Sequence, residues 1–444
     1  MKVFLETYGC QMNASDSELI RSIIKTAGHE MTTSIHEAEV ALINTCAIRE
    51  NAHRKIYGRL DMLRPIKKRL MRQKRDLVVG LLGCMAQNLK ETLFRHPVVN
   101  MIVGPDNYRA LPRLIEKVRR KESREIDADL SEYETYSGIA PDRMEGVNAW
   151  VTIMRGCDNF CTFCVVPYTR GRERSRSMKE ILEEVTALAV QGYPQVTLLG
   201  QNVNSYRFGE ASFADLIKKV ADTPGIQRVR FTSPHPKDFP EPLLEAIASH
   251  PHICKHIHLP LQSGSDRILE LMNRTYTHME YIRLVEKIRR MIPGIAITTD
   301  IIVGFPTETE DAYQETAGVM EAVRFDSAYI FKYSERKGTI AARRFPDYIS
   351  AEIKTERIVR LFELQRRISL EKHRESIGRS VEVLIEGDAE NRPDYQFGKS
   401  EGNQSVFFPA TPFGPGSLVR VEITNASTGT LYGNALTSPV LSCI

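Results

Sequence analysis

Three cysteines packed into eight residues are the part of this chain whose residue types and spacing most directly imply chemistry. Cys157, Cys161 and Cys164 form a C-x3-C-x2-C group that follows the apolar run Trp150–Met154. A disulfide would pair two of these thiols and leave the third alone, so one shared centre is favoured. A structural zinc site would need a fourth ligand from a second C-x2-C or H-x3-H pair, and no such pair follows. Three thiolates suit a 4Fe–4S cluster whose fourth iron keeps an open coordination position, with a partial zinc site or three unrelated thiols as alternatives.

Three further cysteines each follow a segment with the pattern of a buried strand. Cys10, Cys46 and Cys84 lie far apart in the chain, and the first and last follow glycine. The carboxyl ends of parallel strands meet at the edge of an open α/β sheet where ligands bind, so we expect these thiols to converge there. The arrangement predicts a second iron–sulfur cluster held by three cysteines. The alternatives are three cysteines that only fill the core and a set of redox-active thiols without a metal. The predicted strands are Lys2–Tyr8, Val40–Ile43 and Leu77–Leu82.

The composition is typical of a soluble globular protein. Of the 444 residues, 42% are hydrophobic and 26% are charged, a length that suits about two to four domains. The start of the chain does not resemble a signal peptide, because Glu6 follows almost at once. The longest apolar run, Leu77–Ala86, has about half the length that a membrane-spanning helix needs. We therefore expect a cytoplasmic protein without a membrane partner, in which the eight cysteines serve metal or redox chemistry rather than disulfides.

Positive charge is concentrated in a few segments, although the net charge is only +4. One basic helix is usually a solvated face, but several in one chain favour a partner with a phosphate backbone. The most basic segment holds ten Lys and Arg residues against the single acid Asp61. The basic segments are Arg54–Arg75, Arg113–Arg124, Arg170–Lys179 and Arg283–Arg290.

Residues 1–124 alternate strand and helix patterns, which predicts a flavodoxin-like open parallel sheet with helices on both faces. One helix is expected over Ser15–Ala27, with Ser15 as the cap and Glu18 at capping-box spacing. Another is expected over Ala47–Lys74 and should break at Pro65. Two more strand–helix pairs follow, and residues 125–146 are acidic and aperiodic, which predicts a linker.

Residues 147–374 repeat the alternation, and six parallel strands predict a partial (β/α)6 barrel with functional residues at the carboxyl ends of its strands. The predicted strands are Trp150–Met154, Val196–Leu199, Arg228–Thr232, His256–Leu261, Ile297–Val303 and Ala328–Phe331.

The end of the chain has a different pattern. A long basic helix is expected over Ala351–Ser376, and residues 375–444 contain short strands separated by glycines, which predicts a small β-barrel. Phe397, Lys399 and Phe407 suggest base stacking or phosphate contacts, and a capping β-domain without RNA contacts fits equally well. The predicted strands are Val381–Glu386, Val406–Pro409, Leu418–Thr424 and Thr430–Leu436.

Motifs over nearly the whole chain resemble the methylthiotransferases of the S-adenosylmethionine (SAM) radical superfamily. An aromatic residue before the last cysteine, here Phe163, is part of the superfamily pattern. The sequences Tyr-Gly-Cys-Gln-Met-Asn and Asn-Thr-Cys-x-Ile-Arg-Glu around the first two cysteines are similar to the branch that acts on N6-isopentenyladenosine beside the tRNA anticodon. The matching segments are Thr7–Asn13, Asn44–Ala52, Gly83–Cys84, Val165–Arg176, Leu199–Asn204, His258–Ser265 and Asp300–Pro306.

The resemblance implies two 4Fe–4S clusters and SAM as cofactors. The C–H bond at carbon 2 of adenine is too unreactive for acid–base chemistry, so a radical is needed to attack it. The cluster of Cys157, Cys161 and Cys164 would generate that radical by passing an electron to bound SAM, which is cleaved to a 5′-deoxyadenosyl radical. The other cluster would present the sulfur, which a second SAM methylates. Gly-Gln-Asn stands where many radical-SAM enzymes have Gly-Gly-Glu. Polar residues at the ends of the predicted barrel strands can supply hydrogen-bond partners for SAM, although ordinary loop caps and turns are rich in the same residue types. They are Gly200, Gln201, Asn202, Ser233, Gln262, Ser263 and Asp300, with Phe163 and Ile302 as apolar packing.

The resemblance also implies partners. The small β-barrel occupies the position of the family's TRAM RNA-binding domain, and the substrate would be the tRNA anticodon stem-loop, with the adenine splayed out as single-stranded bases usually are when read. A flavodoxin or ferredoxin would supply electrons, and the enzyme would be a monomer. The alternatives are action on threonylcarbamoyladenosine in tRNA or on a ribosomal protein, and a non-catalytic iron–sulfur protein that binds RNA.

Overall fold

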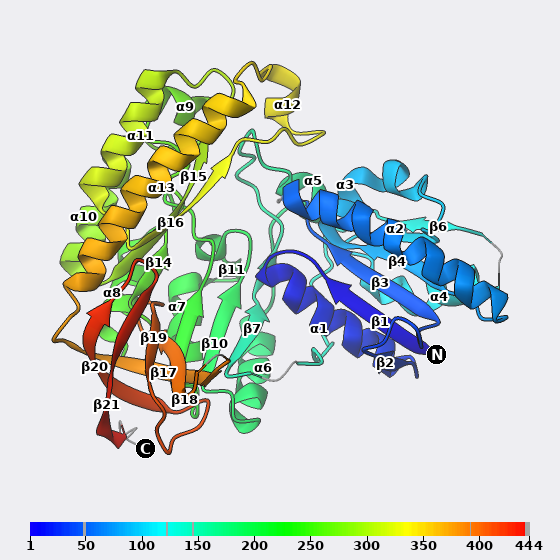
Figure 1. The fold of residues 1–444 in the computed structure, drawn as a ribbon, viewed down its shortest axis with the longest axis horizontal. Coiled ribbons are helices and arrows are strands. Elements are labelled where there is room, and N and C mark those ends of the chain that lie inside the picture. The colour runs from blue at the N-terminus through cyan, green and yellow to red at the C-terminus, as the bar shows by residue number, and fades with distance from the viewer. Residues whose placement is uncertain (48–49, 121–122, 144–145, 391, 440–444) are drawn as a thin grey trace.

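The chain folds into three parts that follow one another along the sequence (Figure 1). The computed structural model describes residues 1–47, 50–120, 123–143, 146–390 and 392–439. The sheet domain lies on the right of the view, the larger barrel on the left, and the small β-barrel below the larger one. Separate apolar clusters fill the three parts. Within the described ranges, no helix is long and apolar enough to cross a lipid bilayer.

The amino-terminal part is an all-parallel sheet with helices on both faces. Its elements are β1 (Lys2–Thr7), α1 (Gln11–Thr26), β2 (Glu30–Thr32), β3 (Val40–Thr45), α2 (Glu50–Arg72), β4 (Val78–Leu82), α3 (Gly83–Phe94), β5 (Met101–Val103), α4 (Leu111–Arg119) and β6 (Glu125–Asp127). The strand order β2-β1-β3-β4-β5-β6 confirms the flavodoxin-like prediction. Along β3, Val40 and Leu42 pack into one apolar cluster while Ala41 and Ile43 pack into the other. Both faces are therefore covered, which explains why this strand is apolar without alternation.

Helix α1 begins four residues earlier than the sequence suggested, so the predicted cap at Ser15 is wrong. Cys10 is the N-cap residue, and Ser15 lies inside the helix, where its hydroxyl is 3.0 Å from Thr152 Oγ1 of the barrel. The capping-box spacing was misleading because a tertiary contact, rather than the helix end, uses the Ser15 side chain.

Helix α2 continues through Pro65, so the predicted break is also wrong. Proline removes one hydrogen bond from the helix. Leu63 and Leu70, on either side of it, are buried in the same apolar cluster, and this packing holds the two halves on one axis.

Two edge strands escaped prediction. Strands β2 and β6 have three residues each and pair with β1 and β5 through their backbones. Strand β6 lies within residues 125–146, the segment predicted to be a linker. Three residues are too few to show a side-chain period, so the pairing becomes visible only in the folded sheet.

The central part is a partial barrel of six parallel strands, as predicted. Its strands are β7 (Asn148–Thr152), β10 (Gln195–Leu199), β13 (Arg228–Phe231), β14 (His256–His258), β15 (Ala296–Val303) and β16 (Ser327–Lys332). Its main helices are α6 (Met178–Val190), α7 (Phe213–Ala221), α8 (Glu241–Ser249), α10 (His278–Met291), α11 (Glu310–Val323) and α13 (Ala351–Arg374). Strands β7, β10 and β13 form one half and β14, β15 and β16 the other, and a parallel bridge between Val229 and Ile253 joins them.

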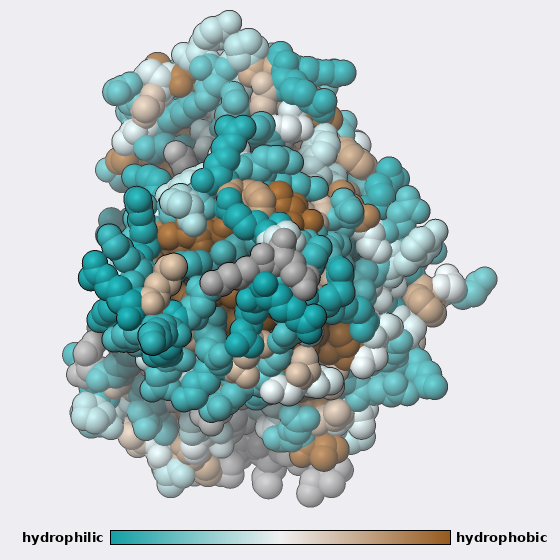
Figure 2. Space-filling view, turned by 90° about the vertical axis from the view of Figure 1, so that its right-hand side faces the viewer, coloured by the Kyte–Doolittle hydropathy of each residue, from teal (hydrophilic) through white to brown (hydrophobic). Residues whose placement is uncertain are grey.

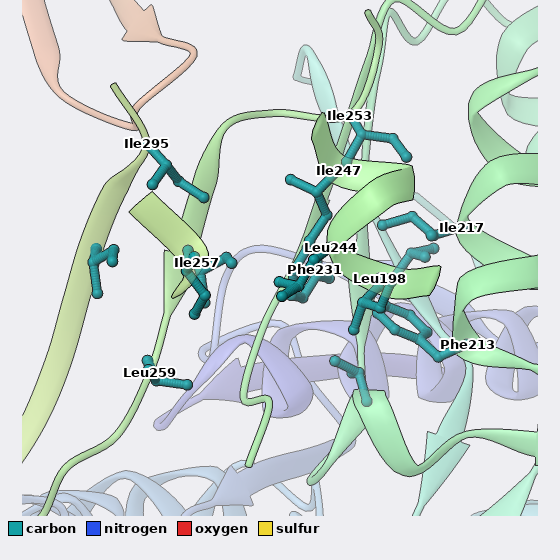
Figure 3. Packing of buried hydrophobic residues seen from close by; sticks show 14 of the residues in the cluster. Leu198, Phe213, Ile217, Phe231, Leu244, Ile247, Ile253, Ile257, Leu259 and Ile295 are labelled. Atoms are coloured by element: carbon teal, nitrogen blue, oxygen red, sulfur yellow. The ribbon is translucent and has the colours of Figure 1, made fainter. Parts of the chain in front are cut away.

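The barrel is held by apolar packing between its strands and the surrounding helices. Figure 3 shows Leu198 and Phe231 on the strands close to Phe213 of α7 and Leu244 of α8. The shorter elements of this part are β8 (Met154–Arg155), α5 (Val166–Arg170), β9 (Arg174–Ser175), β11 (Arg207–Phe208), β12 (Ala211–Ser212), α9 (Asp266–Leu271) and α12 (Ile340–Arg344).

The carboxyl-terminal part is a closed five-stranded barrel with strand order β17-β18-β19-β21-β20. The strands are β17 (Ser380–Ala389), β18 (Arg392–Ser400), β19 (Ser405–Pro409), β20 (Leu418–Ala426) and β21 (Thr430–Pro439). The sequence suggested four strands and missed β18, which contains Pro393 and Gly398, residues depleted in strands. Buried Arg228 and Arg230, from β13 of the central barrel, donate hydrogen bonds of 2.7 Å to backbone carbonyls at the end of β18. This small barrel is thereby fixed to the face of the central barrel where its strands begin.

Candidate functional site

The three cysteines of the amino-terminal sheet converge as expected. Cys10 follows β1, Cys46 follows β3 and Cys84 opens α3 after β4, and these three strands are neighbours in the sheet. A hydrogen bond with Cys46 lowers the pKa of the Cys10 thiol, and the nearby Arg170 guanidinium lowers it further. We call this set of three cysteines the sheet trio.

The backbone around the sheet trio accepts only glycine at one turn. Gly83 has a φ of +87°, and a Cβ there would lie 2.4 Å from Asn44 Oδ1 and 2.6 Å from the Thr45 carbonyl oxygen. Asn13 Nδ2 donates hydrogen bonds of 3.0 Å to both of those oxygens and fixes them in place. The turn before Cys84 therefore packs directly against the two residues before Cys46, and only glycine fits there. We call this packed turn the glycine cradle.

The second set, called the loop trio, consists of Cys157, Cys161 and Cys164 on one loop between β8 and α5. The Cys157 backbone N–H bonds to the Gly171 carbonyl at 3.1 Å, and a turn places the Cys164 N–H 2.9 Å from the Cys161 carbonyl. Thr162 anchors the middle of the loop, because its N–H and hydroxyl donate hydrogen bonds of 3.0 and 2.7 Å to the backbone carbonyls of Met272 and Leu271 at the end of α9.

The two trios differ in their electrostatic surroundings. Burial raises the pKa of the Cys157 thiol to about 11 and that of the Cys164 thiol to about 12, and the neighbouring thiols add to both shifts. In the sheet trio, the hydrogen bond with Cys46 and the Arg170 guanidinium lower the pKa of the Cys10 thiol, whereas burial raises the pKa of the Cys84 thiol although Arg170 opposes it. Within the described residues, no three His, Cys, Asp or Glu side chains could hold a single metal ion. The cysteines of a 4Fe–4S cluster bind different irons and are therefore farther apart than the ligands of a single ion. A search for single-ion sites does not test for such a cluster.

The two trios lie at facing edges of their domains. Helix α3, which contains Cys84, packs against helix α5, which begins two residues after Cys164. Cys84 is in one small apolar cluster with Ala47 and Val165, the residues that follow Cys46 and Cys164. This contact brings the carboxyl edge of the sheet next to the loop of the barrel.

A buried ion-pair network joins the same two edges. Asp16 of α1 is 2.7 Å from a guanidinium nitrogen of Arg155 and 2.7 Å from one of Arg170, and all three side chains are at most 4% exposed. Burial raises the pKa of the Asp16 carboxyl, but the two arginines outweigh it and the net shift is downward. The carboxylate is therefore charged in the folded protein.

Some of the residues expected to contact SAM line the mouth of the barrel. Gln201 Oε1 accepts a hydrogen bond of 2.5 Å from the N–H of Gly156, just before the loop trio. Asp300 Oδ2 lies 3.2 Å from His258 Nε2 and is partly exposed. Phe163 and Ile302 are partly buried and pack against the same apolar cluster.

Other members of the expected SAM set hold loops together. Asn202 is buried, and its side chain accepts a hydrogen bond from the His235 N–H at 3.1 Å and donates one to Asp238 at 3.2 Å. Ser263 is fully buried, with its hydroxyl 3.4 Å from Thr316 Oγ1 of α11. These two side chains have protein partners. Gly200, Ser233 and Gln262 lie in the turns that follow β10, β13 and β14, the last two with positive φ.

Sequence reasoning missed the buried charges of the site. Asp16 and Arg155 carry no local signal of their role, because an isolated acid in a helix is usually exposed. Arg274 is half-buried, its guanidinium lies 5.8 Å from the centroid of the Tyr276 ring, and it is in the field of the loop trio. A motif search could have found Arg170 alone, within the segment that follows Cys164.

Three known sequence families match successive parts of the chain. Residues 2–104 match the Uncharacterized protein family UPF0004, residues 151–320 match the Radical SAM superfamily, and residues 374–436 match the TRAM domain.

Curated relatives match over nearly the full length. The chain is 48% identical to the tRNA-2-methylthio-N(6)-dimethylallyladenosine synthase of Bacteroides fragilis, over 98% of this chain and 96% of the relative. It is 45% identical to the protein of the same name from Porphyromonas gingivalis strain W83, over 99% and 96%.

Solved structures share the fold at low sequence identity. The radical S-adenosylmethionine methyltransferase TsrM from Kitasatospora setae, with cobalamin and a 4Fe-4S cluster bound, superimposes with a TM-score of 0.56 at 14% identity, over 77% of this chain and 74% of that one. The cobalamin-dependent S-adenosylmethionine radical enzyme OxsB superimposes with a TM-score of 0.53 at 12% identity, over 82% and 56%. At these identities the likeness concerns the fold alone.

Proposed function

The chain belongs to the family of tRNA-2-methylthio-N(6)-dimethylallyladenosine synthases, and we propose that it inserts sulfur and a methyl group at carbon 2 of N6-isopentenyladenosine beside the tRNA anticodon. It is a radical-SAM tRNA methylthiotransferase. The observation that carries the proposal is the apposition of two three-cysteine sets, one per α/β part, through the contact of Cys84 with Val165. A reaction that needs both a radical and a sulfur donor requires two such centres close to one substrate atom.

The residues present fit two 4Fe–4S clusters. Each trio supplies three thiols and leaves one iron position open, and the glycine cradle of Gly83 leaves no room for a side chain beside the sheet trio. When bound, the cluster of the loop trio supplies the electron that cleaves SAM, and the cluster of the sheet trio supplies sulfur. That the sheet trio holds a cluster of its own is part of this proposal.

The protein's own task is to position SAM and exclude water at the mouth of the barrel. Phe163 and Ile302 offer an apolar surface beside the loop trio, and Asp300 offers a carboxylate held by His258. Gln201 ties the turn after β10 to the loop that carries Cys157, so that the two move as one unit. In this proposal nine residues either contact SAM or position the loops around it. They are Gly200, Gln201, Asn202, Ser233, Gln262, Ser263, Asp300, Ile302 and Phe163.

Helix α2 supports an RNA partner for the sheet domain. It begins four residues after Cys46, and Arg64, Lys68 and Arg72 are exposed on it at spacings of four residues, which places them on one face. The row leads away from the sheet trio over about 12 Å. Figure 2, which looks at the sheet-domain end of the molecule, shows hydrophilic side chains over much of this surface. An anticodon stem whose loop enters at the cysteines would lie along this row.

The α2 row can be tested by salt-dependent binding. Replacing Arg64, Lys68 and Arg72 with glutamine should weaken binding of an anticodon stem-loop and reduce the slope of log K against log salt by about 0.7 to 0.9 for each phosphate that is no longer neutralised. A matched control removes three charges from Arg283, Lys287 and Arg290 of α10, at the opposite side of the molecule (Figure 1). Equally weakened binding in both variants would mean that only net charge matters.

Further properties belong to the same proposal. A flavodoxin or ferredoxin delivers electrons to the loop trio, the chain works as a monomer, and the tRNA substrate places it in the cytoplasm. The TRAM domain, residues 374–436, is the second RNA contact.

The function is tested with anaerobic, iron-loaded protein, dithionite, SAM and synthetic anticodon stem-loops. We expect 5′-deoxyadenosine and a methylthio product by mass spectrometry with N6-isopentenyladenosine, and little product with unmodified adenosine. Absence of 5′-deoxyadenosine would mean an RNA-binding iron–sulfur protein. Product only with threonylcarbamoyladenosine, or only with a ribosomal protein, would move the chain to another branch.

A further inference from the structure

Asp16 receives cations from both ends of the loop that carries the loop trio. Arg155 lies two residues before Cys157, and Arg170 lies six residues after Cys164. Both guanidinium groups converge on one carboxylate of the sheet domain at 2.7 Å. Since α1 begins immediately after Cys10, the carboxylate is rigidly connected to the sheet trio. The loop of one centre is thus held at both ends by the domain of the other.

Arg170 also contacts the sheet trio directly. Its Nε–H donates a hydrogen bond of 3.2 Å to Cys84 Sγ, while Nη2 is paired with Asp16. Helix α5 therefore carries a cation across the domain boundary onto a sulfur that the sheet domain supplies.

The same guanidinium has an N–H group that the protein does not satisfy. Arg170 Nη1 is buried and has no hydrogen-bond partner among the described residues, and the same holds for Arg155 Nε and Nη1. A buried donor without an acceptor destabilises a folded protein. Arg155 has partial compensation, because its guanidinium stacks 4.6 Å from the centroid of the Tyr136 ring. Arg170 Nη1 has no such ring contact in the described structure, and sulfide of an iron–sulfur cluster is an acceptor that would satisfy it.

From these contacts we propose that Arg170 is a positioning residue that sets the reduction potential of the cluster held by the sheet trio. The proposal rests on the proposed function in assuming that the sheet trio binds a cluster. Hydrogen bonds and positive charge near cluster sulfurs stabilise the more negative reduced state and raise the potential. Asp16 holds the guanidinium in the orientation that points Nε–H at Cys84. Because Arg170 lies on α5, next to the loop trio, the reduction potential of the sheet-trio cluster depends on how the two domains pack together.

The potential can be measured on the full chain with the three cysteines of the loop trio replaced by alanine, so that one cluster remains. In this background, Arg170→Gln should shift the midpoint potential of the cluster, followed by electron paramagnetic resonance, to a more negative value. Arg170→Lys keeps the charge but cannot reach both Cys84 and Asp16, so a smaller shift in the same direction is expected. The matched control is Arg367→Gln on α13, an arginine also paired with carboxylates but half exposed.

In the otherwise native protein, Arg170→Lys should still form 5′-deoxyadenosine from SAM, because that reaction uses the loop trio. The methylthio product should fall about 10–100-fold. If the Arg170→Gln variant does not bind iron, the proposal is tested by the midpoint potential of the iron-loaded Arg170→Lys variant.

An unchanged potential in iron-loaded Arg170→Lys, or in iron-loaded Arg170→Gln, overturns the proposal. This readout needs neither tRNA nor SAM. A shifted potential, combined with failure of the unaltered protein to make the methylthio product, would count against the proposed function and leave this inference standing.

Discussion

The sheet trio and the loop trio reach similar arrangements of three thiols by different routes. The loop trio lies within eight residues, and its geometry comes from one turn and from Thr162, which anchors the loop to the barrel. The sheet trio takes one cysteine from each of three adjacent strands, so its geometry depends on the register of β1, β3 and β4. A local loop tolerates changes elsewhere in the fold. A site assembled from strand ends fails whenever the sheet edge shifts, and this difference predicts which centre is lost first.

The largest expected effect separates the chemistry of the two trios. Replacing Cys157, Cys161 and Cys164 with alanine should abolish 5′-deoxyadenosine formation, because the thiols beside the SAM site are gone. Replacing Cys10, Cys46 and Cys84 should leave SAM cleavage and abolish only the methylthio product. Iron analysis should give about half the iron of the unaltered protein in each variant. A sheet-trio variant that keeps full iron would show that those cysteines hold no cluster.

A smaller effect tests the dependence of the sheet trio on its backbone. Gly83→Ala introduces a side chain at a φ of +87° with backbone and Asn44 atoms closer than 3 Å. We expect a loss of about 1–2 kcal/mol from the backbone conformation and about 1–3 kcal/mol more from the clash, measured by urea unfolding. Iron should be lost from the sheet trio first.

The control for this change is Gly28→Ala. Gly28 has a φ of +79°, but a Cβ at that position would meet no atom within 4 Å, so the variant should show the backbone cost alone and full iron content. Equal stability and equal iron content in the two variants would contradict the claim that the atoms packed around Gly83 exclude a side chain there.

The smallest effect concerns thiol reactivity in iron-free protein. The thiolate is the reactive form, the pKa of Cys10 is lowered, and those of Cys157 and Cys164 are raised to about 11 and 12. Near neutral pH, iodoacetamide should therefore modify Cys10 before the other two, and its reactivity should persist to lower pH. Mass spectrometry of peptides taken over time measures the order. The reverse order would mean that the sheet trio lacks the stabilising contacts of Cys46 and Arg170.

The sign of the pH effect on stability also differs between Cys10 and two thiols of the loop trio in iron-free protein. The contribution of Cys10, whose pKa is lowered, is present above the ordinary thiol pKa and is lost as pH falls through the folded value. The contributions of Cys157 and Cys164 are present below the ordinary thiol pKa and are lost as pH rises through about 11 and 12.

Much of the fold followed from periodicity. Strands β10 and β15 lie within one residue of their predicted bounds, Val196–Leu199 and Ile297–Val303, because buried strands of a parallel sheet are marked by their apolar residues. Strand β18 and the edge strands β2 and β6 were missed, because their residues are poor strand formers or too few to show a period. The start of α1 and the continuity of α2 were mistaken, because tertiary packing overrode a local cap signal and a proline.

The sequence alone determined which cysteines belong together, since spacing marks the loop trio and strand ends mark the sheet trio. Only the tertiary structure decided that the two sets face each other, that Asp16 holds Arg155 and Arg170, and that Arg170 reaches Cys84 from 86 residues away. The physical reason is the range of the interactions. Turns, caps and side-chain periods act between near neighbours and leave a local pattern, whereas a buried charge is stable only beside partners that the complete fold brings together.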